Sequence, residues 1–347
     1  KFVLADDFFQ ALVKMSGPNF DIQFWCARDA QEHYRIKNHA KCAIFDKAVA
    51  ILGGSNLTPT IKSATADLDV MVSGQAAVEV GASFESLFYA MSRQENSASN
   101  SSTCFDANTS EMMMEEKKDY NNHFLDMIRG CEWDDTDCQV AILRSTPSSK
   151  GDDAIYRVVL DKLRSAKSEF LMAMGHSCFP MAFALAAKDA TERGVSVGVT
   201  VNSVYSNDLR TGQRDLFLSI RDVLKIAPKV EFYSTSMTNN NVSGDPSTPV
   251  SESLVGPEFL HAKYVTVDQC WSAVGSWNCW NRSAFYEIEH EAFVESPLVA
   301  GLLREKFLRD ASVLCTLLVS ETECQPGGKY CPKGCFVCQG FGPFHRE

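Results

Sequence analysis

Two stretches of the chain carry the same reactive side chains at the same spacing. The first reads HAKCAIFDKAVAILGGSN from His39, and the second reads HAKYVTVDQCWSAVGSWN from His261. Because a repeat that preserves spacing also preserves geometry, we expect both copies to present these side chains in the same way. The other matched residues, in order of their offset from the histidine, are Lys41 and Lys263, Asp46 and Asp268, Gly53 and Gly275, Asn56 and Asn278, and Asp67 and Glu289.

Two histidines can share the work of cleaving a phosphodiester. An imidazole has an ordinary pKa of about 6.5, so one ring can be neutral and attack phosphorus while the other is protonated and donates to the leaving oxygen. This division of roles requires the two copies to face each other across a pseudo-two-fold axis and form one site. We therefore take His39 and His261 as the candidate catalytic pair.

The other matched residues fit the same chemistry. Lysine and asparagine can donate hydrogen bonds to the nonbridging oxygens, where negative charge builds during attack. An acid can accept a hydrogen bond from the far nitrogen of a histidine and so hold its tautomer. The predicted donors are Lys41, Lys263, Asn56 and Asn278, and the predicted acids are Asp67 and Glu289.

A supporting set completes the candidate site. Asp46 and Asp268 are expected to tie down the turn that follows each lysine strand. Serine is not expected to be a shared reactive group, because Ser55 and Ser276 fall at different offsets. The supporting residues are Asp46, Asp268, Ser276 and the glycines Gly53, Gly54 and Gly275, which permit a tight turn or a close approach of the backbone to phosphate.

This arrangement resembles the phospholipase D superfamily, whose signature H-x-K-x4-D occurs twice and is each time followed by G-[GS]-x-N. The segments GGSN followed by ADLDVMVSG, and GSWN followed by AFVESP, are similar to the secreted bacterial branch. The resemblance implies a two-lobe α/β/α sandwich, no required metal or other cofactor, and a phosphohistidine intermediate. It also implies that His39 is the nucleophile and that His261 is the acid.

The hydrophobic pattern predicts an α/β fold with two pseudo-symmetric lobes, each a mixed, largely parallel sheet flanked by helices. In the second half, strands at 139–145, 169–175, 195–203 and 229–234 alternate with helices at 153–165, 181–193 and 215–226. The predicted divisions are 1–91 for the first lobe, 92–138 for a polar and acidic insertion or linker, 139–312 for the second lobe, and 313–347 for a cysteine-rich tail.

The first lobe is expected to be incomplete at its N-terminal side. Its helix at 6–15 and strand at 20–27 match the helix at 215–226 and the strand at 229–234 of the second lobe. Counting back through the second lobe leaves roughly 60 residues without a counterpart. A separate N-terminal fragment, a partner, or a longer polypeptide would supply them.

Charge and cysteine content bear on partner and compartment. The net charge of -11 is unfavourable for binding a polyanion, so nucleic acid is a less favoured partner than a phospholipid at a membrane surface.

Of thirteen cysteines, five lie between Cys315 and Cys338, which favours disulfides and a secreted or lumenal glycoprotein. A zinc site remains as the weaker alternative, because C-x6-C-x3-C-x2-C is an unfamiliar spacing. Candidate sequons begin at Asn100, Asn108 and Asn241.

Other interpretations of these residues stay open. Within the same superfamily the chain could be a metal-independent nuclease, and a noncatalytic lipid-binding protein is a third possibility. A metal site built from both catalytic histidines and both acids is disfavoured by the adjacent lysines. His176 follows a strand end, where it could touch substrate or be structural. We expect the remaining histidines to be solvated, at His33, His123 and His345, or within a strand, at His290.

Overall fold

The computed structural model describes residues 37–55, 65–98, 138–145, 154–202, 210–235, 259–313 and 315–318. The chain divides into two compact units, one made of residues 28–83 and 137–347, called the main unit below, and one made of residues 1–27 and 84–136. Both copies of the repeat lie in the main unit. No helix within the described stretches is long and apolar enough to cross a membrane.

A nine-stranded mixed sheet forms the centre of the main unit. Its strands run in the order β1-β13-β12-β11-β7-β8-β9-β14, and β6 also pairs with β13. The strands β7, β8 and β9 are parallel, whereas β11, β12, β13 and β6 form antiparallel pairs. The bounds are β1 Lys37–Asn38, β6 Gln139–Ser145, β7 Glu169–Met174, β8 Ser196–Val201, β9 Glu231–Thr235, β11 Lys263–Val267, β12 Trp271–Gly275, β13 Glu287–Glu295 and β14 Cys315–Leu318.

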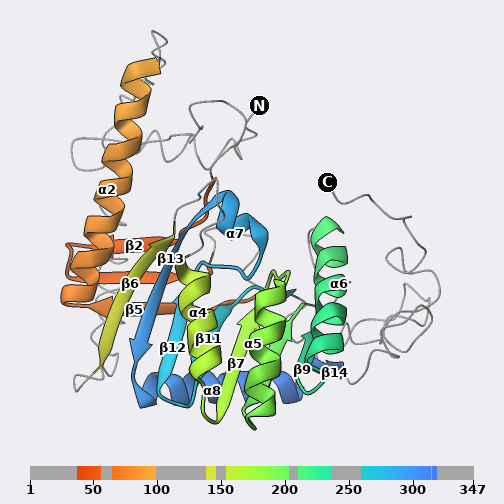
Figure 1. Ribbon diagram of the computed structural model, residues 1–347. Helices are drawn as coiled ribbons and strands as arrows, with labels where there is room; N and C mark the ends of the chain where they lie inside the picture. The colour runs from red at the N-terminus through yellow and green to blue at the C-terminus, as the bar shows by residue number, and fades with distance from the viewer. Residues whose placement is uncertain are drawn as a thin grey trace, which may run out of the picture. The chain divides into compact units, whose positions relative to one another are not determined.

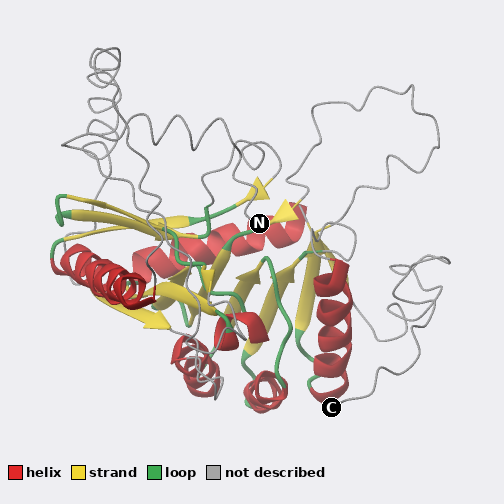
Figure 2. Ribbon diagram, turned by 90° about the horizontal axis from the view of Figure 1, so that it is seen from above, coloured by secondary structure: helices red, strands yellow, loops and turns green. Residues whose placement is uncertain are grey.

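Helices cover both faces of this sheet, as Figures 1 and 2 show. The strand β7 is buried along almost its whole length, as expected for a strand covered on both faces. Its residues Phe170 and Met172 join the cluster under α4, α5 and α6, whereas Leu171 joins the cluster with Phe307 of α8. The helices are α4 Ala154–Ser165, α5 Met181–Glu192, α6 Arg210–Ile226, α7 Asn281–Phe285 and α8 Pro297–Val313.

The first copy of the repeat forms a separate three-stranded antiparallel sheet in the order β2-β3-β5. Leu52 and Val72 of this sheet pack with Val80 of α2 and with Ala292 of β13. The small sheet is therefore joined to the large one through a shared apolar cluster. Its elements are β2 Cys42–Phe45, β3 Val49–Gly53, β5 Asp69–Ser73 and α2 Gln75–Ala98, and a two-stranded sheet pairs β4 Thr65–Ala66 with β10 Phe259–Leu260.

The two copies have the same local fold. In each, the lysine strand and the next strand are joined by a turn whose two central residues have positive φ, with values of 52° and 56° at Asp46 and Lys47 and of 51° and 54° at Asp268 and Gln269. Two such residues in succession are typical of a type I′ hairpin turn. The third strand of each copy then pairs antiparallel with the second. The preserved spacing thus corresponds to a preserved three-strand unit.

The α/β class and the flanking helices agree with the sequence prediction, and so do the positions of α4, α5, β6, β7, β8 and β9 within a few residues. The large sheet is less parallel than expected, because hairpin turns join β11 to β12 and β13 returns beside β12. The helix α2 continues to Ala98, and β14 adds part of the predicted tail to the sheet. The expected helix at 6–15, the strand at 20–27, the sequons and the cysteines from 324 to 338 lie outside the described residues.

His290 lies on β13, as expected of a strand residue, and provides a test of the packing between β13 and α2. Its Nε2 atom is 2.9 Å from the Ser83 hydroxyl, and its Nδ1 atom is buried without a partner among the described residues. Burial lowers the pKa of His290 to about 4, and the Arg144 guanidinium acts in the same direction. The unfolded chain therefore binds a proton below a pH of about 6.5 that the folded chain binds only below about 4.

We predict that the unfolding free energy falls as pH decreases from about 6.5 to about 4, because unfolding takes up this proton. The variant His290→Gln should flatten that dependence by up to about 1.4 kcal/mol per pH unit. Urea unfolding at several pH values would measure it. The control Ser83→Ala removes the hydrogen bond but keeps the histidine, so it should retain the wild-type slope. Equal slopes in His290→Gln and wild type would contradict the buried placement.

Candidate active site

Short strands bring the two copies of the repeat together. The strand β1, which leads into His39, runs parallel to the start of β13 with Asn38 opposite Ile288. The strand β10, which leads into His261, runs parallel to β4 with Leu260 opposite Ala66. Each histidine therefore follows a strand that lies beside the strand leading to the acid of the other copy. The backbone N–H groups of His39 and Ala40 both donate to the Ile288 carbonyl.

The histidines and acids form crossed pairs. Nδ1 of His39 is 3.0 Å from Oε2 of Glu289, although Glu289 belongs to the second copy. Nδ1 of His261 is 2.7 Å from Oδ2 of Asp67, which belongs to the first copy. A carboxylate on Nδ1 fixes the ring and directs Nε2 to the chemistry. Neither copy can orient its own histidine without the other.

Glu289 is fully buried and held by three side chains. The Ser276 hydroxyl donates to Oε2 at 2.6 Å and the Ser283 hydroxyl donates to Oε1 at 2.8 Å, while His39 makes the third contact. Burial raises the pKa of Glu289 to about 7, and the two hydroxyl donors oppose that change. Ser276 thus supports the acid on His39, whereas Ser283 had not been recognised in the sequence because it has no marked spacing.

Asp67 packs closely against Gly54. Its Oδ1 accepts from the Leu68 N–H at 2.9 Å, and a Cβ atom placed on Gly54 would lie 2.2 Å from that oxygen. Gly54 is the counterpart of Ser276 by offset. The first copy therefore combines glycine with the shorter acid, and the second combines serine with the longer one.

The two lysines make equivalent contacts. Nζ of Lys41 donates to the His39 carbonyl at 2.7 Å, and Nζ of Lys263 donates to the His261 carbonyl. Lys263 is fully buried, and burial lowers its pKa to about 8. Burial also lowers the pKa of Lys41, and the Glu289 carboxylate opposes that change. Both ammonium groups are thus poorly hydrated and lie beside the histidines.

The same surroundings act on the histidines. Burial lowers the pKa of His39 to about 3, and the Lys41 ammonium acts in the same direction. Burial also lowers the pKa of His261, but the hydrogen bond with Asp67 opposes it. His39 is consequently a neutral imidazole near pH 7. An anion entering between the lysines would favour the protonated form of His261.

Asn278 has the properties of a ligand-binding side chain. It is fully buried, and neither Oδ1 nor Nδ2 has a hydrogen-bond partner within the described part of the chain. A buried amide left without partners costs about 1–3 kcal/mol, so an oxygen-rich ligand at this point would relieve a real penalty. Its counterpart Asn56 lies outside the described residues.

A further pair of matched acids was missed in the sequence. Asp69 and Glu291 both lie two residues beyond the acids that contact the histidines. Oδ1 of Asp69 accepts from the Ser55 N–H at 3.1 Å, and Oε2 of Glu291 accepts from the Trp277 N–H at 3.4 Å. These acids hold the loops that lead to the asparagines. Extending the comparison of offsets by two residues would have found them.

The supporting glycines are needed for packing between strands. A Cβ atom on Gly53 would lie 1.8 Å from an Asp69 carboxylate oxygen, and one on Gly275 would lie 2.2 Å from the His290 carbonyl oxygen.

The two turn acids differ in their hydrogen bonding and exposure. Asp268 accepts hydrogen bonds from the backbone of 167–169 and from the Ser168 hydroxyl, whereas Asp46 is exposed.

His261 is also positioned by residues that the sequence did not mark. Nδ2 of Asn202 donates to the Gly175 and Leu260 carbonyls at 2.7 Å each, and Oδ1 of Asn202 accepts from the Leu260 N–H. Gly175 is required here, because a Cβ atom on it would lie 2.6 Å from the Leu260 carbonyl oxygen. The next residue, His176, places its ring edge-on to His261 with centroids 5.9 Å apart.

One group in the described part of the chain has ligand atoms spaced for a metal ion. These atoms belong to His39, Glu287 and Glu289 and lie within 4.8 Å of one another. Both carboxylates already accept hydrogen bonds from protein donors, Glu287 from Arg282 and Trp280 and Glu289 from its two serines. A cation would have to compete with those donors. The group differs from the metal site considered from the sequence, because His261 and Asp67 are not in it.

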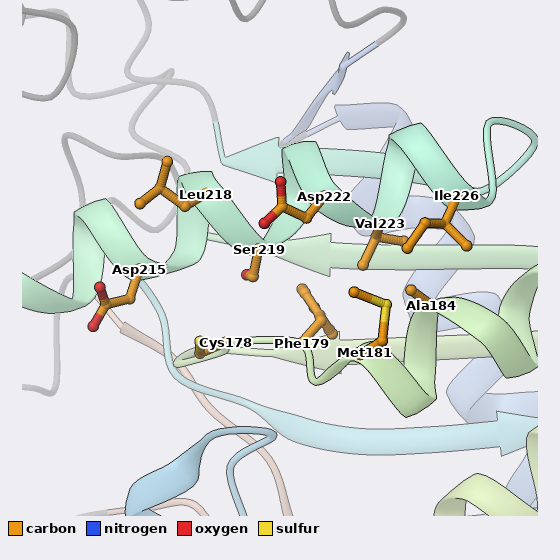
Figure 3. Close-up of a pocket in the computed structure, with 10 residues that line it drawn as sticks. All are labelled: Cys178, Phe179, Met181, Ala184, Asp215, Leu218, Ser219, Asp222, Val223 and Ile226. Carbon is orange, nitrogen blue, oxygen red and sulfur yellow. The ribbon is translucent and has the colours of Figure 1, made fainter. Parts of the chain in front are cut away.

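A separate cavity of about 220 Å³ lies between α6 and the beginning of α5. Figure 3 shows the lining residues Asp215 and Asp222 on α6, and Phe179 and Met181 on the neighbouring segment. None of the predicted site residues lines this cavity.

Among the described cysteines, Cys42, Cys178 and Cys270 are free thiols, so the expectation of disulfides is not met at these three.

Comparisons with known proteins bear on the family and on the fold. Residues 159–311 match a family model described as "Cardiolipin synthase, PLD-like domain". The phosphatidylserine synthase structure from Haemophilus influenzae Rd KW20 is 13% identical with a TM-score of 0.51, over 82% of this chain and 64% of that chain. Nuc from Salmonella typhimurium, described as a phospholipase D family member, is 18% identical with a TM-score of 0.37, over 53% of this chain and 100% of that chain.

The chain therefore spans 64% of the synthase, and at 13% identity that likeness concerns the fold alone. No curated protein is similar in sequence to this chain.

The crossed pairs predict a specific pattern of energetic coupling. In double-mutant cycles, His39→Gln with Glu289→Gln and His261→Gln with Asp67→Asn should each show a coupling of about 1 kcal/mol or more, because the partners are in contact. The exchanged combinations, His39→Gln with Asp67→Asn and His261→Gln with Glu289→Gln, are the matched controls and should couple more weakly. Urea unfolding measures all four cycles. Stronger coupling within each copy would show that the pairs are not crossed.

Proposed function

We propose that the chain, whose residues 159–311 match a PLD-like domain, is a phosphodiesterase of the phospholipase D superfamily that hydrolyses the head-group ester of a phospholipid through a phosphohistidine intermediate. The crossed contacts of His39 with Glu289 and of His261 with Asp67 carry this proposal. They set two imidazoles, each backed by a carboxylate on Nδ1, in one buried cluster. Two such rings are what a two-step displacement at phosphorus requires.

In the first step His39 is the nucleophile. Its lowered pKa keeps the ring neutral, and the contact between Nδ1 and Glu289 leaves the lone pair on Nε2. A bond forms between Nε2 and phosphorus while the bond from phosphorus to the head-group oxygen breaks. His261 donates its Nε2 proton to that oxygen, so the head group leaves as a neutral alcohol. Asp67 stabilises the imidazolium of His261 before the transfer.

In the second step water replaces the head group. His261 takes a proton from a water molecule, the water oxygen bonds to phosphorus, and the bond from phosphorus to His39 breaks. The products are the phosphate monoester and the restored pair of histidines. An alcohol in place of water would give head-group exchange by the same route. Lys41, Lys263 and Asn278 are the proposed donors to the nonbridging oxygens in both steps, with Asn56 as the counterpart of Asn278.

Lipid is favoured over nucleic acid because the net charge of -11 opposes nonspecific binding of a polyanion. We further propose a secreted or lumenal location and action at a membrane surface, which rest on the cysteine and sequon content. Membership of the secreted bacterial branch is proposed on the flanking segments of the two motifs. The cysteines that lie outside the described residues remain candidates for disulfides.

We predict that purified protein releases head-group alcohol and phosphatidic acid from phospholipid vesicles without added metal. His39→Ala and His261→Ala should each lose about 10³-fold or more in turnover, and the double variant should lose little more, because the two rings act as one unit. Mass spectrometry of the released alcohol measures this. The control His290→Gln removes a buried histidine that lies outside the site and should keep turnover within a few-fold of wild type.

The covalent intermediate gives a second, independent readout. Incubation of His261→Asn with substrate, followed by quenching at alkaline pH, should leave a phosphoryl group on His39 that peptide mass spectrometry can locate. Strong turnover by His39→Ala would refute the nucleophile assignment. Cleavage of single-stranded DNA but not of any phospholipid would instead identify a nuclease. Vesicle binding without turnover would identify a noncatalytic lipid-binding protein.

A further inference from the structure

One side of the site has residues that only the second copy of the repeat supplies. Trp280, Arg282 and Glu287 form contacts with one another, His176 stacks on Trp280, and we call these four residues the asymmetric wall. The counterparts of Trp280, Arg282 and Glu287 by offset in the first copy are threonines, at Thr58, Thr60 and Thr65. The wall therefore breaks the pseudo-symmetry that the catalytic residues obey.

The wall is a continuous chain of contacts. The His176 ring stacks on the Trp280 ring with centroids 5.2 Å apart, and the Arg282 guanidinium lies 4.6 Å from the Trp280 ring centroid. Arg282 then donates to Glu287 at 2.6 Å, and the Trp280 indole N–H donates to the same carboxylate at 3.2 Å. Each member is thus held by at least one other.

The ends of the wall meet both catalytic histidines. At one end the His176 ring contacts the ring of His261. At the other end the Glu287 carboxylate lies within 4.8 Å of a ring nitrogen of His39. Because His261 is the proposed donor to the leaving oxygen, the wall runs beside the place of the departing head group. Positive charge from Arg282 is also among the causes that lower the pKa of His176, after burial and the site residues.

The cationic side chain of the asymmetric wall is partly exposed, whereas its anionic side chain is buried. The Arg282 side chain is 37% exposed, whereas the Glu287 side chain is 1% exposed. Burial lowers the pKa of His176 to about 3, so that ring is neutral near pH 7. The His176 ring and the Arg282 guanidinium both lie against the Trp280 ring, so a quaternary ammonium would have to compete with them for that ring. A choline head group is therefore not favoured here.

We propose that Arg282 binds the head group, and that the site selects phospholipids whose leaving alcohol carries a carboxylate or a second phosphate. This inference rests on the proposed function and names its substrate class. A guanidinium matches both anions with paired N–H donors. Glu287 keeps a hydrogen-bond donor in this interaction, because the indole N–H of Trp280 still donates to that carboxylate when Arg282 turns toward substrate.

The test compares phosphatidylserine with phosphatidylethanolamine, whose head groups differ only by the carboxylate. Both are presented at equal mole fraction in the same phosphatidylcholine vesicles, so that surface charge and access are shared. Wild-type protein should release serine about ten- to a hundredfold faster than ethanolamine, as expected for hydrogen bonds to a charged group. Arg282→Gln should reduce that ratio about tenfold or more. Mass spectrometry measures both alcohols in one sample.

Two further variants separate the role of Arg282 from effects on Glu287 and on folding. Arg282→Gln combined with Glu287→Gln also removes the buried carboxylate with which Arg282 pairs, and it should keep the reduced ratio if Arg282 itself contacts the head group. Arg304→Gln is the matched control, because Arg304 is 32% exposed and pairs with Glu169 on β7. It should retain the wild-type ratio.

Each outcome decides between the two proposals. An unchanged ratio in Arg282→Gln, or a wild-type ratio restored in the double variant, would overturn the assignment of Arg282 while leaving phospholipid cleavage intact. Absence of release from all three lipids by wild-type protein would overturn the proposed function and this inference with it. Cleavage of an oligodeoxynucleotide in place of lipid, dependent on Arg282, would assign the arginine to a neighbouring nucleic-acid phosphate and overturn the lipid class.

Discussion

The site depends on an exchange of partners between the two copies of the repeat. Each histidine follows a short strand that pairs beside the strand leading to the acid of the other copy, so His39 meets Glu289 and His261 meets Asp67. The backbone pairings set the distance, and the carboxylates set the orientation of the rings. If one copy moved away, two carboxylates and two imidazoles would lose their partners at once. A buried charge left unpaired costs several kcal/mol, so the assembly of the site and the packing of the two sheets are coupled.

The cluster places like and unlike charges in a poorly hydrated space. Lys263 and Glu289 are both fully buried, and burial shifts their pKa values toward each other, to about 8 and about 7. Both groups have exchanged water for fixed protein groups. The Asn278 amide remains without a partner in the described structure. A phosphodiester would supply both the negative charge between the ammonium groups and the oxygen that the amide lacks, so these unfavourable features become favourable ones when such a ligand binds.

Sequence spacing predicted which residue types occupy the site, because a repeat in register must give the same strand and turn twice. It could not predict the exchange of acids, since Asp67 and Glu289 stand at the same offset and either histidine could have been assigned to either acid. Sequence spacing also could not predict contacts between segments that lie far apart in the chain. Asn202, for example, positions His261 across 58 residues of chain, with no local pattern to mark it. The sheet was expected to be largely parallel because strands and helices alternate, but the repeat itself consists of hairpins, whose strands are antiparallel.

Pseudo-symmetry creates a difficulty that the second copy resolves. Two equivalent histidines would compete for the same role, whereas the chemistry needs one ring that attacks and one that donates a proton. The surroundings differ in three respects. The side chain of His39 is 24% exposed and that of His261 is 7% exposed. Glu287 lies near His39, and its counterpart by offset in the first copy is Thr65. Among the described residues, a third histidine packs against the ring of His261 but not against that of His39. The duplicated strands supply the two rings, and residues without a matched counterpart make those rings inequivalent. The assignment of one histidine as nucleophile and the other as acid therefore comes from residues that differ between the two copies, and not from the residues that match.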